Sequence, residues 1–383
     1  MPTIAERVAE IYRAEEAAQR KVLTRADVPA RYEAITPQWL TDVLCREVPG
    51  AAVVNCRVGD FSNGSSNRAR IYVSYNDVGA RAALPATVFC KSSTTLANRT
   101  LLANVGVGQA ESNFFNKVRS RLDMEAPQPV HAAFDPDTYA YVVVMKDMGG
   151  TVDFCTHKST IDRKHAESLV DTLARLHARF YQSAELGTAA LPFKTWYKWW
   201  EDNLKATADY EQACDTGFGA AEALIPVRLF KRRSDIWPAT MRSAELHRQL
   251  PHTLIHCDVH LANWYVAADG RMGLGDWHCT SIGHWSRDFA YAIGTALTVE
   301  DRRRWDMDLL RLYLKRMAEY GAPKIDFDEA FRNVRQQSPS ALAFWTITLR
   351  PAKGMPDMQP ESTSYEFVKR LATAVDDWEA LDA

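Results

Sequence analysis

Apolar residues in the first third of the chain follow the pattern of strands separated by turns. Ser, Asn and Gly in SNGSSN (62–67) favour a turn, and a short polar stretch at Asp135-Pro136-Asp137 favours another before an apolar strand that ends at Met145. Three further segments combine β-forming residues with turn formers at their ends, and they are AAVVNCRVGDF (51–61), RARIYVSYN (68–76) and ALPATVFCKSS (83–93). With a helix expected in QAESNFFNKVRSRL (109–122), the pattern predicts an antiparallel sheet that carries one main helix.

Beyond Gly150 the spacing of apolar residues becomes that of helices. In TIDRKHAESLVDTLARLHARFY (160–181) they recur every three or four residues on one helical face, at Ala166, Leu169, Leu173, Leu176 and Phe180. Helical patterns also cover residues 4–22 and 35–48, the second after the start signal Thr36-Pro37. We therefore expect an α+β chain with three parts. These are an N-terminal helical extension (1–49), a sheet lobe (50–148) and a larger helical lobe (149–383) that contains the polar segment described below.

Composition excludes several classes of function. The 383 residues carry a formal net charge of −2, so no general attraction to nucleic acid or to acidic membranes is expected. No run of about 18 apolar residues occurs, which predicts no transmembrane helix and no membrane partner. The seven cysteines are scattered without a C-x-x-C pair, which argues against a disulfide framework and favours a reducing, cytoplasmic location.

The segment IHCDVHLAN (255–263) concentrates ionisable side chains between apolar flanks. One interpretation is a metal site formed by His256, Asp258 and His260, typical of a metal-dependent hydrolase. The other is phosphoryl transfer, which needs a carboxylate to accept the acceptor's proton and oxygen ligands for magnesium. Asp258 can be that catalytic base, and Asn263 and Asp276 can be the metal ligands, because a short hairpin closed at Asp269-Gly270 could bring them together.

These motifs resemble those of a known family. IHCDVHLANW and LGDW resemble the H-G-D-x-H-x-x-N and D-W signature of the aminoglycoside phosphotransferase and choline kinase group, most closely its ecdysteroid-kinase-like branch. The resemblance covers roughly residues 50–300 and implies a protein-kinase-like bilobal fold that uses ATP and Mg²⁺. It also implies that Asp288 braces the catalytic segment. Cys257 departs from the pattern because it stands where the family usually has glycine, which narrows the loop's conformational freedom.

The expected nucleotide site lies in the sheet lobe. No Walker motif or G-x-G-x-x-G occurs, so the candidate phosphate cover is the turn FSNGSSNR, with Ser65 and Ser66. Lys91 ends an apolar strand and must find an anion or reach solvent; ATP phosphates would serve, and Glu111 could pair with it. VVVMKDMGG resembles the hinge segment of kinases, which implies adenine contacts with the backbone from Lys146 to Met148.

The predicted function is that of an ATP- and magnesium-dependent kinase, a phosphotransferase acting on the hydroxyl of a small molecule, as a monomer or homodimer. A metal-dependent hydrolase and a non-catalytic nucleotide-binding protein remain the alternatives. Trp196, Trp199 and Trp200 share one helical face, which is either buried core or the wall of a pocket for a bulky, ring-containing alcohol. Acidic residues of the helical lobe could instead meet the ammonium groups of an aminoglycoside, and these are Glu201, Asp202, Asp306, Asp308, Asp357 and Glu361.

Overall fold

The computed structural model describes residues 3–64, 66–207, 209–355 and 357–383. The chain forms two compact units, and each is treated by itself below. The first contains residues 1–120 and 127–150, and the second contains residues 121–126 and 151–383. Within the described parts of the chain, no helix combines the length and the apolar character needed to cross a membrane.

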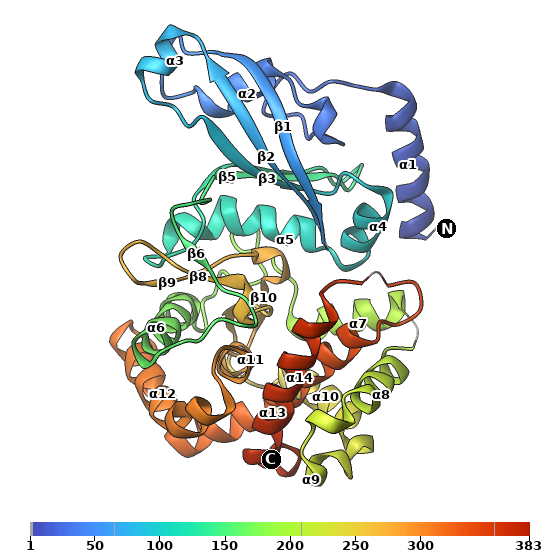
Figure 1. The fold of residues 1–383 in the computed structure, drawn as a ribbon, viewed down its shortest axis with the longest axis vertical. Coiled ribbons are helices and arrows are strands. Elements are labelled where there is room, and N and C mark those ends of the chain that lie inside the picture. The colour runs from blue at the N-terminus through green and yellow to red at the C-terminus, as the bar shows by residue number, and fades with distance from the viewer. Residues whose placement is uncertain (1–2, 65, 208, 356) are drawn as a thin grey trace. The chain divides into compact units, whose positions relative to one another are not determined.

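A five-stranded antiparallel sheet forms the centre of the first unit, in the order β1-β2-β3-β5-β4 (Figure 1). Its strands are β1 (Val53–Asn63), β2 (Asn67–Tyr75), β3 (Thr87–Ser92), β4 (Pro129–Phe134) and β5 (Tyr141–Lys146). The helices of this unit are α1 (Ile4–Ala18), α2 (Pro37–Leu44), α3 (Asp77–Arg81), α4 (Leu96–Val105) and α5 (Val107–Asn113). The predicted strands and their antiparallel pairing are confirmed.

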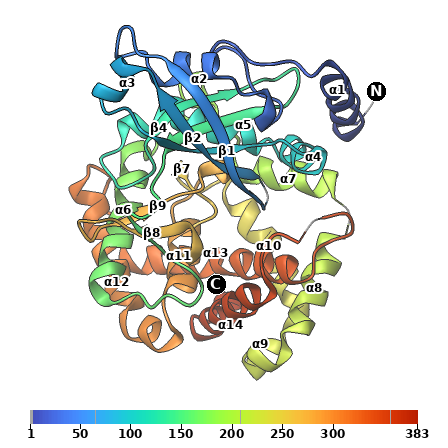
Figure 2. The ribbon, with the colours of Figure 1, turned by 45° about the horizontal axis from the view of Figure 1, so that its top comes forward.

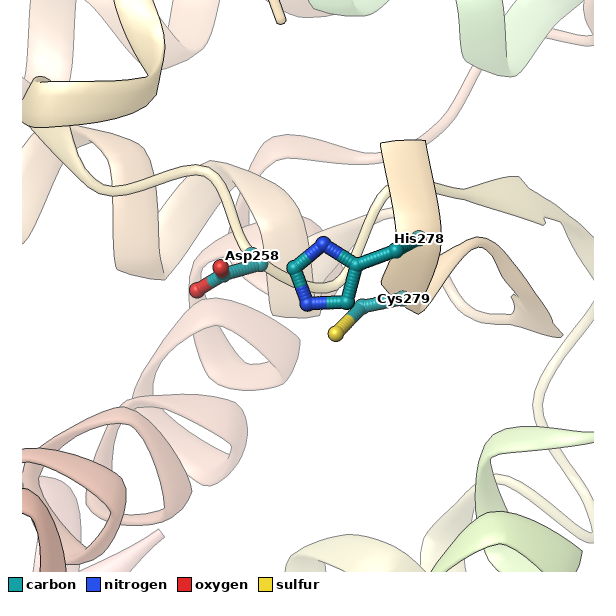
Figure 3. A group of neighbouring side chains, drawn as sticks. All are labelled: Asp258, His278 and Cys279. Atoms are coloured by element: carbon teal, nitrogen blue, oxygen red, sulfur yellow. The ribbon is translucent and has the colours of Figure 1, made fainter. Parts of the chain in front are cut away.

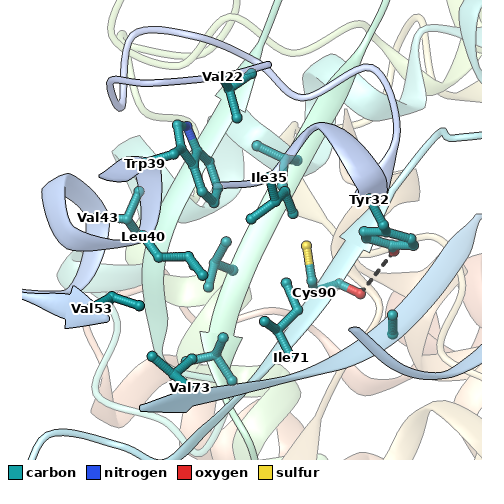
Figure 4. Close-up of a cluster of buried hydrophobic side chains, with 14 of the residues drawn as sticks. Val22, Tyr32, Ile35, Trp39, Leu40, Val43, Val53, Ile71, Val73 and Cys90 are labelled. Carbon is teal, nitrogen blue, oxygen red and sulfur yellow. Dashed lines mark hydrogen bonds between the residues drawn. The ribbon is translucent and has the colours of Figure 1, made fainter. Parts of the chain in front are cut away.

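Residues 22–45 supply much of the apolar core on one face of this sheet. Trp39 and Leu40 from α2 are fully buried, and they share a cluster with Ile71 of β2 and Cys90 of β3 (Figure 4). The Tyr32 hydroxyl donates to the main-chain oxygen of Cys90 at 3.2 Å. α2 begins as predicted because the Thr36 hydroxyl accepts from the Trp39 N–H and Pro37 occupies the first turn. The segment before residue 50 is therefore part of the core of the first unit.

The helical region ahead of β4 is longer than the sequence predicted. The expected helix at 109–122 corresponds to α5, followed by a π-helical turn (Phe114–Val118) and a 3₁₀ turn (Arg119–Arg121). α4 was not predicted. It starts where the Thr95 hydroxyl caps the Asn98 N–H, and it ends at Gly106, whose φ of +75° separates it from α5.

The second unit is mainly helical, and α13 lies at its centre, packed on α8, α10, α11 and α14 (Figure 2). The helices are α6 (Arg163–Phe180), α7 (Trp196–Ala206), α8 (Tyr210–Ala220), α9 (Val227–Phe230), α10 (Arg233–Leu246), α11 (Ser286–Ala296), α12 (Val299–Glu319), α13 (Phe327–Leu349) and α14 (Glu361–Asp377). The apolar face predicted for residues 160–181 is buried along α6.

Short strands in the second unit hold the polar segments. They are β6 (Asp153–Phe154), β7 (Thr253–Ile255), β8 (Trp264–Val266), β9 (Met272–Leu274) and β10 (Ser281–Gly283). β8 and β9 form the predicted hairpin, and β7 pairs with β10. Two antiparallel pairings therefore fix residues 256–263 and 275–280 at their ends. The α+β, protein-kinase-like fold class is confirmed, while the roles assigned to segments 1–49, 50–148 and 149–383 stay predictions.

Candidate active site

Residues 256–263, called the catalytic segment below, run from the end of β7 to the start of β8. Asp258 lies in this segment, and both of its carboxylate oxygens accept hydrogen bonds. The Asn263 amide donates to the Asp258 main-chain oxygen at 2.7 Å and to its Oδ2 at 3.1 Å. The Tyr291 hydroxyl on α11 donates to Oδ1 at 3.2 Å. Because donors reach both oxygens, the carboxylate has a fixed orientation.

The surroundings of Asp258 favour its ionised form. Burial by itself would raise the pKa of this carboxyl, but attraction to His260 and His278 outweighs burial and lowers the pKa below its usual value. The His260 Nε2 lies 3.6 Å from Oδ2. An ionised carboxylate can accept a hydroxyl proton. Its low basicity suits phosphoryl transfer, where positioning and charge stabilisation supply most of the catalysis.

Asp288 braces the catalytic segment from the first turn of α11. Its fully buried carboxylate accepts the main-chain N–H of His256 at 2.6 Å and that of Cys257 at 2.9 Å. His177 on α6 contacts the same carboxylate at 3.2 Å. Burial opposes ionisation of Asp288, but the hydrogen bond from His177 and the charges nearby lower its pKa. The bracing position that the resemblance implied is therefore confirmed.

Cys257 has the left-handed backbone that the usual glycine would adopt freely. Its φ is +69°, and its side chain is buried. A residue with a Cβ pays about 1–2 kcal/mol for this conformation, so the two hydrogen bonds to Asp288 offset local strain. Cysteine in place of the usual glycine therefore keeps the backbone conformation of the loop and adds strain to it.

His256 is a structural residue in this arrangement. Its Nδ1 accepts the Asp258 N–H at 3.1 Å, and its Nε2 lies 2.9 Å from the Gly275 carbonyl oxygen, to which it donates. Burial lowers the pKa of His256, which agrees with a neutral ring. With both nitrogens engaged, His256 offers no lone pair to a cation, which argues against the hydrolase interpretation.

Asp276 and Asn263, the predicted metal ligands, lie at the two ends of the β8–β9 hairpin. The Gly275 N–H donates to the Asn263 main-chain oxygen at 2.8 Å, which closes the hairpin beside the catalytic segment. Asp276 has a φ of +60°, and its Oδ1 contacts the Nδ1 of His278. The Asn263 amide nitrogen faces Asp258, so its carbonyl oxygen is the atom suited to magnesium. Metal binding by these residues stays a prediction.

In the first unit, Lys91 and Glu111 form a buried ion pair. The Lys91 Nζ lies 2.8 Å from the Glu111 Oε1, and the two side chains are 4% and 2% exposed. The pair joins β3 to α5. Buried charges of this kind need partners that offset their desolvation, and each ion provides that partner for the other. The predicted pairing is therefore present, and its role with a nucleotide stays a prediction.

For the other four nucleotide-site candidates of the first unit, the structure gives less support than it does for Lys91 and Glu111. Ser66 follows β1 with its hydroxyl buried and without a hydrogen-bond partner in the described part of the chain, whereas Ser65 lies outside the described residues. The Lys146 N–H already donates to the main-chain oxygen of Gln128 at 3.0 Å, so an adenine contact in this segment would use other backbone groups. Met148 follows the end of β5. Contacts of Ser65, Ser66, Lys146 and Met148 with ATP stay predictions.

Two of the three tryptophans of α7 belong to the buried core that also contains Cys257 of the catalytic segment. Trp196 and Trp200 are 1% and 2% exposed, and Trp199 stacks on Trp196 with ring centroids 4.9 Å apart. Cys257 belongs to the same apolar cluster. The core interpretation therefore holds for Trp196 and Trp200, while Trp199 is partly exposed.

Sequence reasoning missed the aromatic support of Asp258. Trp345 on α13 donates to the Tyr291 hydroxyl at 2.7 Å, and that hydroxyl donates to Asp258. Tyr291 stands three residues after Asp288, a helical spacing that could have indicated it. Trp345 lies 54 residues further along the chain, and nothing in its local sequence pointed to this contact.

The fold and this set of side chains define a phosphotransferase of the small-molecule kinase class. The model of the phosphotransferase enzyme family (APH) matches residues 102–325, which is more than half of the chain. The chain belongs to this family. The predicted family and enzyme class are thereby confirmed, and the ecdysteroid-kinase-like branch stays a prediction.

Solved structures show the same fold at low identity. A protein described as an aminoglycoside phosphotransferase from Ralstonia eutropha JMP134 is 14% identical, with 88% of this chain and 96% of that chain covered and a TM-score of 0.50. The aminoglycoside 2′-phosphotransferase-IIIa in its GDP complex is 11% identical, with 90% and 98% covered and a TM-score of 0.50. No curated protein sequence matches the chain significantly.

Proposed function

We propose that the protein transfers the γ-phosphate of ATP, in a magnesium-dependent reaction, to a hydroxyl group of a small molecule. The observation that carries the proposal is the held carboxylate of Asp258. Asn263 and Tyr291 orient it, and the segment that bears it is braced by Asp288. A phosphotransferase needs such a carboxylate aimed at one point, since geometry supplies much of its rate.

In the proposed reaction, the acceptor oxygen forms a bond to the γ-phosphorus while the bond from that phosphorus to the bridging oxygen of ADP breaks. The hydroxyl proton passes to Asp258, which then releases it to solvent. Bound magnesium supplies neutralisation of phosphate charge, and the Asn263 carbonyl oxygen and the Asp276 carboxylate would hold it. Lys91, positioned by Glu111, would contact ATP phosphates.

The acceptor is proposed to be a neutral or anionic hydroxyl compound. Five of the six carboxylates that could have met an aminoglycoside already have cationic partners within the chain. The pairs are Glu201–Lys198, Asp202–Lys194, Asp306–Arg302, Asp308–Arg311 and Glu361–Arg350. A polycationic acceptor would have to compete with these partners, which reduces the net attraction that the carboxylates offer to it. The predicted monomeric or homodimeric state and cytoplasmic location complete the proposal.

The decisive test is Asp258→Asn. Asparagine keeps the shape and can still bond Asn263, but it cannot accept a proton, so kcat should fall about 10²–10⁴-fold. Magnesium-dependent stabilisation by ATP, measured as a shift of Tm, should persist. Release of ADP in the presence of a panel of hydroxylated metabolites measures the rate.

Asp269→Asn is the matched control, because Asp269 is an exposed aspartate at the tip of the β8–β9 hairpin. Its activity should equal that of the wild type. Turnover of Asp258→Asn near the wild-type rate would reject Asp258 as the base. A chain that binds zinc but shows no ATP-dependent shift of Tm would favour the hydrolase instead.

A further inference from the structure

Three different metal-binding groups meet beside the catalytic segment. A carboxylate oxygen of Asp258, a ring nitrogen of His278 and the thiol sulfur of Cys279 all lie within 4.8 Å of one another. Figure 3 shows the three side chains converging from two segments, with Asp258 opposite the 3₁₀ turn that bears His278 and Cys279. All three residues are only partly buried, so an ion from solvent can reach them.

The donor set selects a class of metal. An oxygen, an imidazole nitrogen and a thiolate sulfur together suit Zn²⁺, whereas Mg²⁺ prefers oxygen ligands alone. Zinc donors lie about 3.3–3.7 Å apart when the bonds are about 2.0–2.3 Å and tetrahedral. Side-chain shifts of roughly an ångström would therefore close the present group around one ion, with water as the fourth ligand.

The contact between His278 and Asp276 provides independent support for a metal site. The Nδ1 of His278 faces the Asp276 carboxylate, so Nε2 is the nitrogen that a cation would take. Metal-binding histidines commonly donate their other ring N–H to a carboxylate, which fixes the ring orientation and makes the ligating nitrogen more basic. Asp276 would serve this purpose for His278.

We propose that Asp258, His278 and Cys279 form a binding site for Zn²⁺, and that zinc at this site inhibits the enzyme. On binding, the Cys279 thiol loses its proton to solvent, and sulfur, nitrogen and oxygen each form one bond to the ion. The carboxylate of Asp258 is then a zinc ligand and cannot take the hydroxyl proton. The inhibition rests on the proposed phosphotransferase function, whereas the metal site itself does not.

The site can be tested without an acceptor or ATP. Co²⁺, a spectroscopic substitute for zinc, is titrated into the metal-free full-length protein, and absorption is recorded. A thiolate–cobalt charge-transfer band that saturates at one equivalent is expected, and added Zn²⁺ should abolish it. Cys279→Ser should lose the band. Cys56→Ser is the matched control, because Cys56 is the other partly buried free cysteine, and it should keep the band.

The failure of Cys279→Ser to fold would show as a lowered Tm, and Cys279→Ala then serves as the second variant. A cobalt band that survives in both Cys279 variants, or the absence of the band from the wild type, would overturn the metal site.

Inhibition by zinc is tested separately, by the slow magnesium-dependent hydrolysis of ATP in which water replaces the acceptor.

In that assay, micromolar Zn²⁺ should lower the wild-type rate at least tenfold, and a chelator should restore it. Cys279→Ser should need at least tenfold more zinc for the same loss, and Cys56→Ser should match the wild type. Equal sensitivity of Cys279→Ser and the wild type would overturn the inhibition. A cobalt band without ADP release, both in this assay and with the panel of hydroxylated metabolites, would refute the proposed function but leave the metal site standing.

Discussion

At the scale of single residues, Asp288 holds more of the candidate site in place than Asp258, the proposed base, does. One carboxylate accepts two successive main-chain N–H groups and the His177 ring, and it sits at 0% exposure. Hydrogen bonds to a charged group are each worth about 1.5–3 kcal/mol, and a buried N–H without a partner is costly. Asp288 also stabilises the strained backbone of Cys257, because its carboxylate accepts the hydrogen bond of the Cys257 main-chain N–H.

Asp288→Asn should therefore lower both stability and activity. Asparagine offers one acceptor oxygen and turns its NH₂ group toward the second N–H, so the free energy of unfolding at pH 7 should fall by about 2–4 kcal/mol. Urea denaturation measures this loss. An unchanged midpoint at pH 7 would show that the two main-chain bonds contribute little.

The same variant has a pH signature. The pKa of Asp288 is lower in the folded protein than in the unfolded chain, where it is about 3.9. Its charge therefore stabilises the fold above that pH, and this contribution is lost as the pH falls through the folded value. The difference in stability between wild type and Asp288→Asn should be largest near pH 7 and should shrink below about pH 4. Asp137→Asn, at an exposed aspartate of the turn before β5, is the control for general acid effects.

At the scale of elements, the Lys91–Glu111 pair fastens β3 to α5. Removal of either partner leaves a buried charge uncompensated, which costs about 3–5 kcal/mol, whereas removal of both leaves none. Lys91→Met and Glu111→Gln should therefore each destabilise the protein, and the double variant should lose less than the sum of the two. A coupling free energy of about 0.5–3 kcal/mol is expected from urea denaturation of all four proteins. If the double variant lost as much free energy of unfolding as the two single variants together, Lys91 and Glu111 would not stabilise each other.

α7 is an element whose role the structure changes. Trp200 is 2% exposed and lies 5.1 Å from the Phe344 ring of α13, centroid to centroid. Trp200→Ala should cost about 3–5 kcal/mol of stability, as truncation of a buried tryptophan does, and leave the KM for ATP unchanged. The exposed Lys198 on the same helix provides the control, since Lys198→Ala removes no buried contact. An altered acceptor KM with an unchanged Tm would place Trp200 in the acceptor pocket.

The sequence predicted elements well where a local pattern determined them. The hairpin around Asp269-Gly270, the cap at Thr36 and the helix from Asp162 all depend on residues close together in the chain. α4 escaped prediction because no apolar periodicity marks it, and its start depends on one capping threonine. Asp258, Asn263 and Asp276 followed from their spacing and a family resemblance. The Trp345–Tyr291 contact and the approach of Cys279 to Asp258 come from tertiary packing, which no local spacing encodes.

At the scale of the whole molecule, the first unit cannot be assigned to the sheet segment alone. Trp39 is 0% exposed, packs against the sheet and donates from its indole nitrogen to Asp27 at 3.1 Å. Trp39→Ala should lower the free energy of unfolding by about 3–5 kcal/mol. Leu23→Ala, at a position 47% exposed in the same segment, should change it by less than about 0.5 kcal/mol. Thermal unfolding compares the two, and equal Tm values would separate residues 22–45 from the core.

The shared core also has a consequence for biosynthesis. Val22 and Val144 belong to one apolar cluster, so the segment that leaves the ribosome early cannot be covered until β5 has been made. At about 5–20 residues per second, the intervening chain takes roughly 6–25 s to synthesise. During that interval Ile35, Trp39 and Leu40 have no complete sheet to pack against. The nascent chain should therefore be a client of holding chaperones until residue 150 or so has emerged, and slower translation would lengthen that exposure.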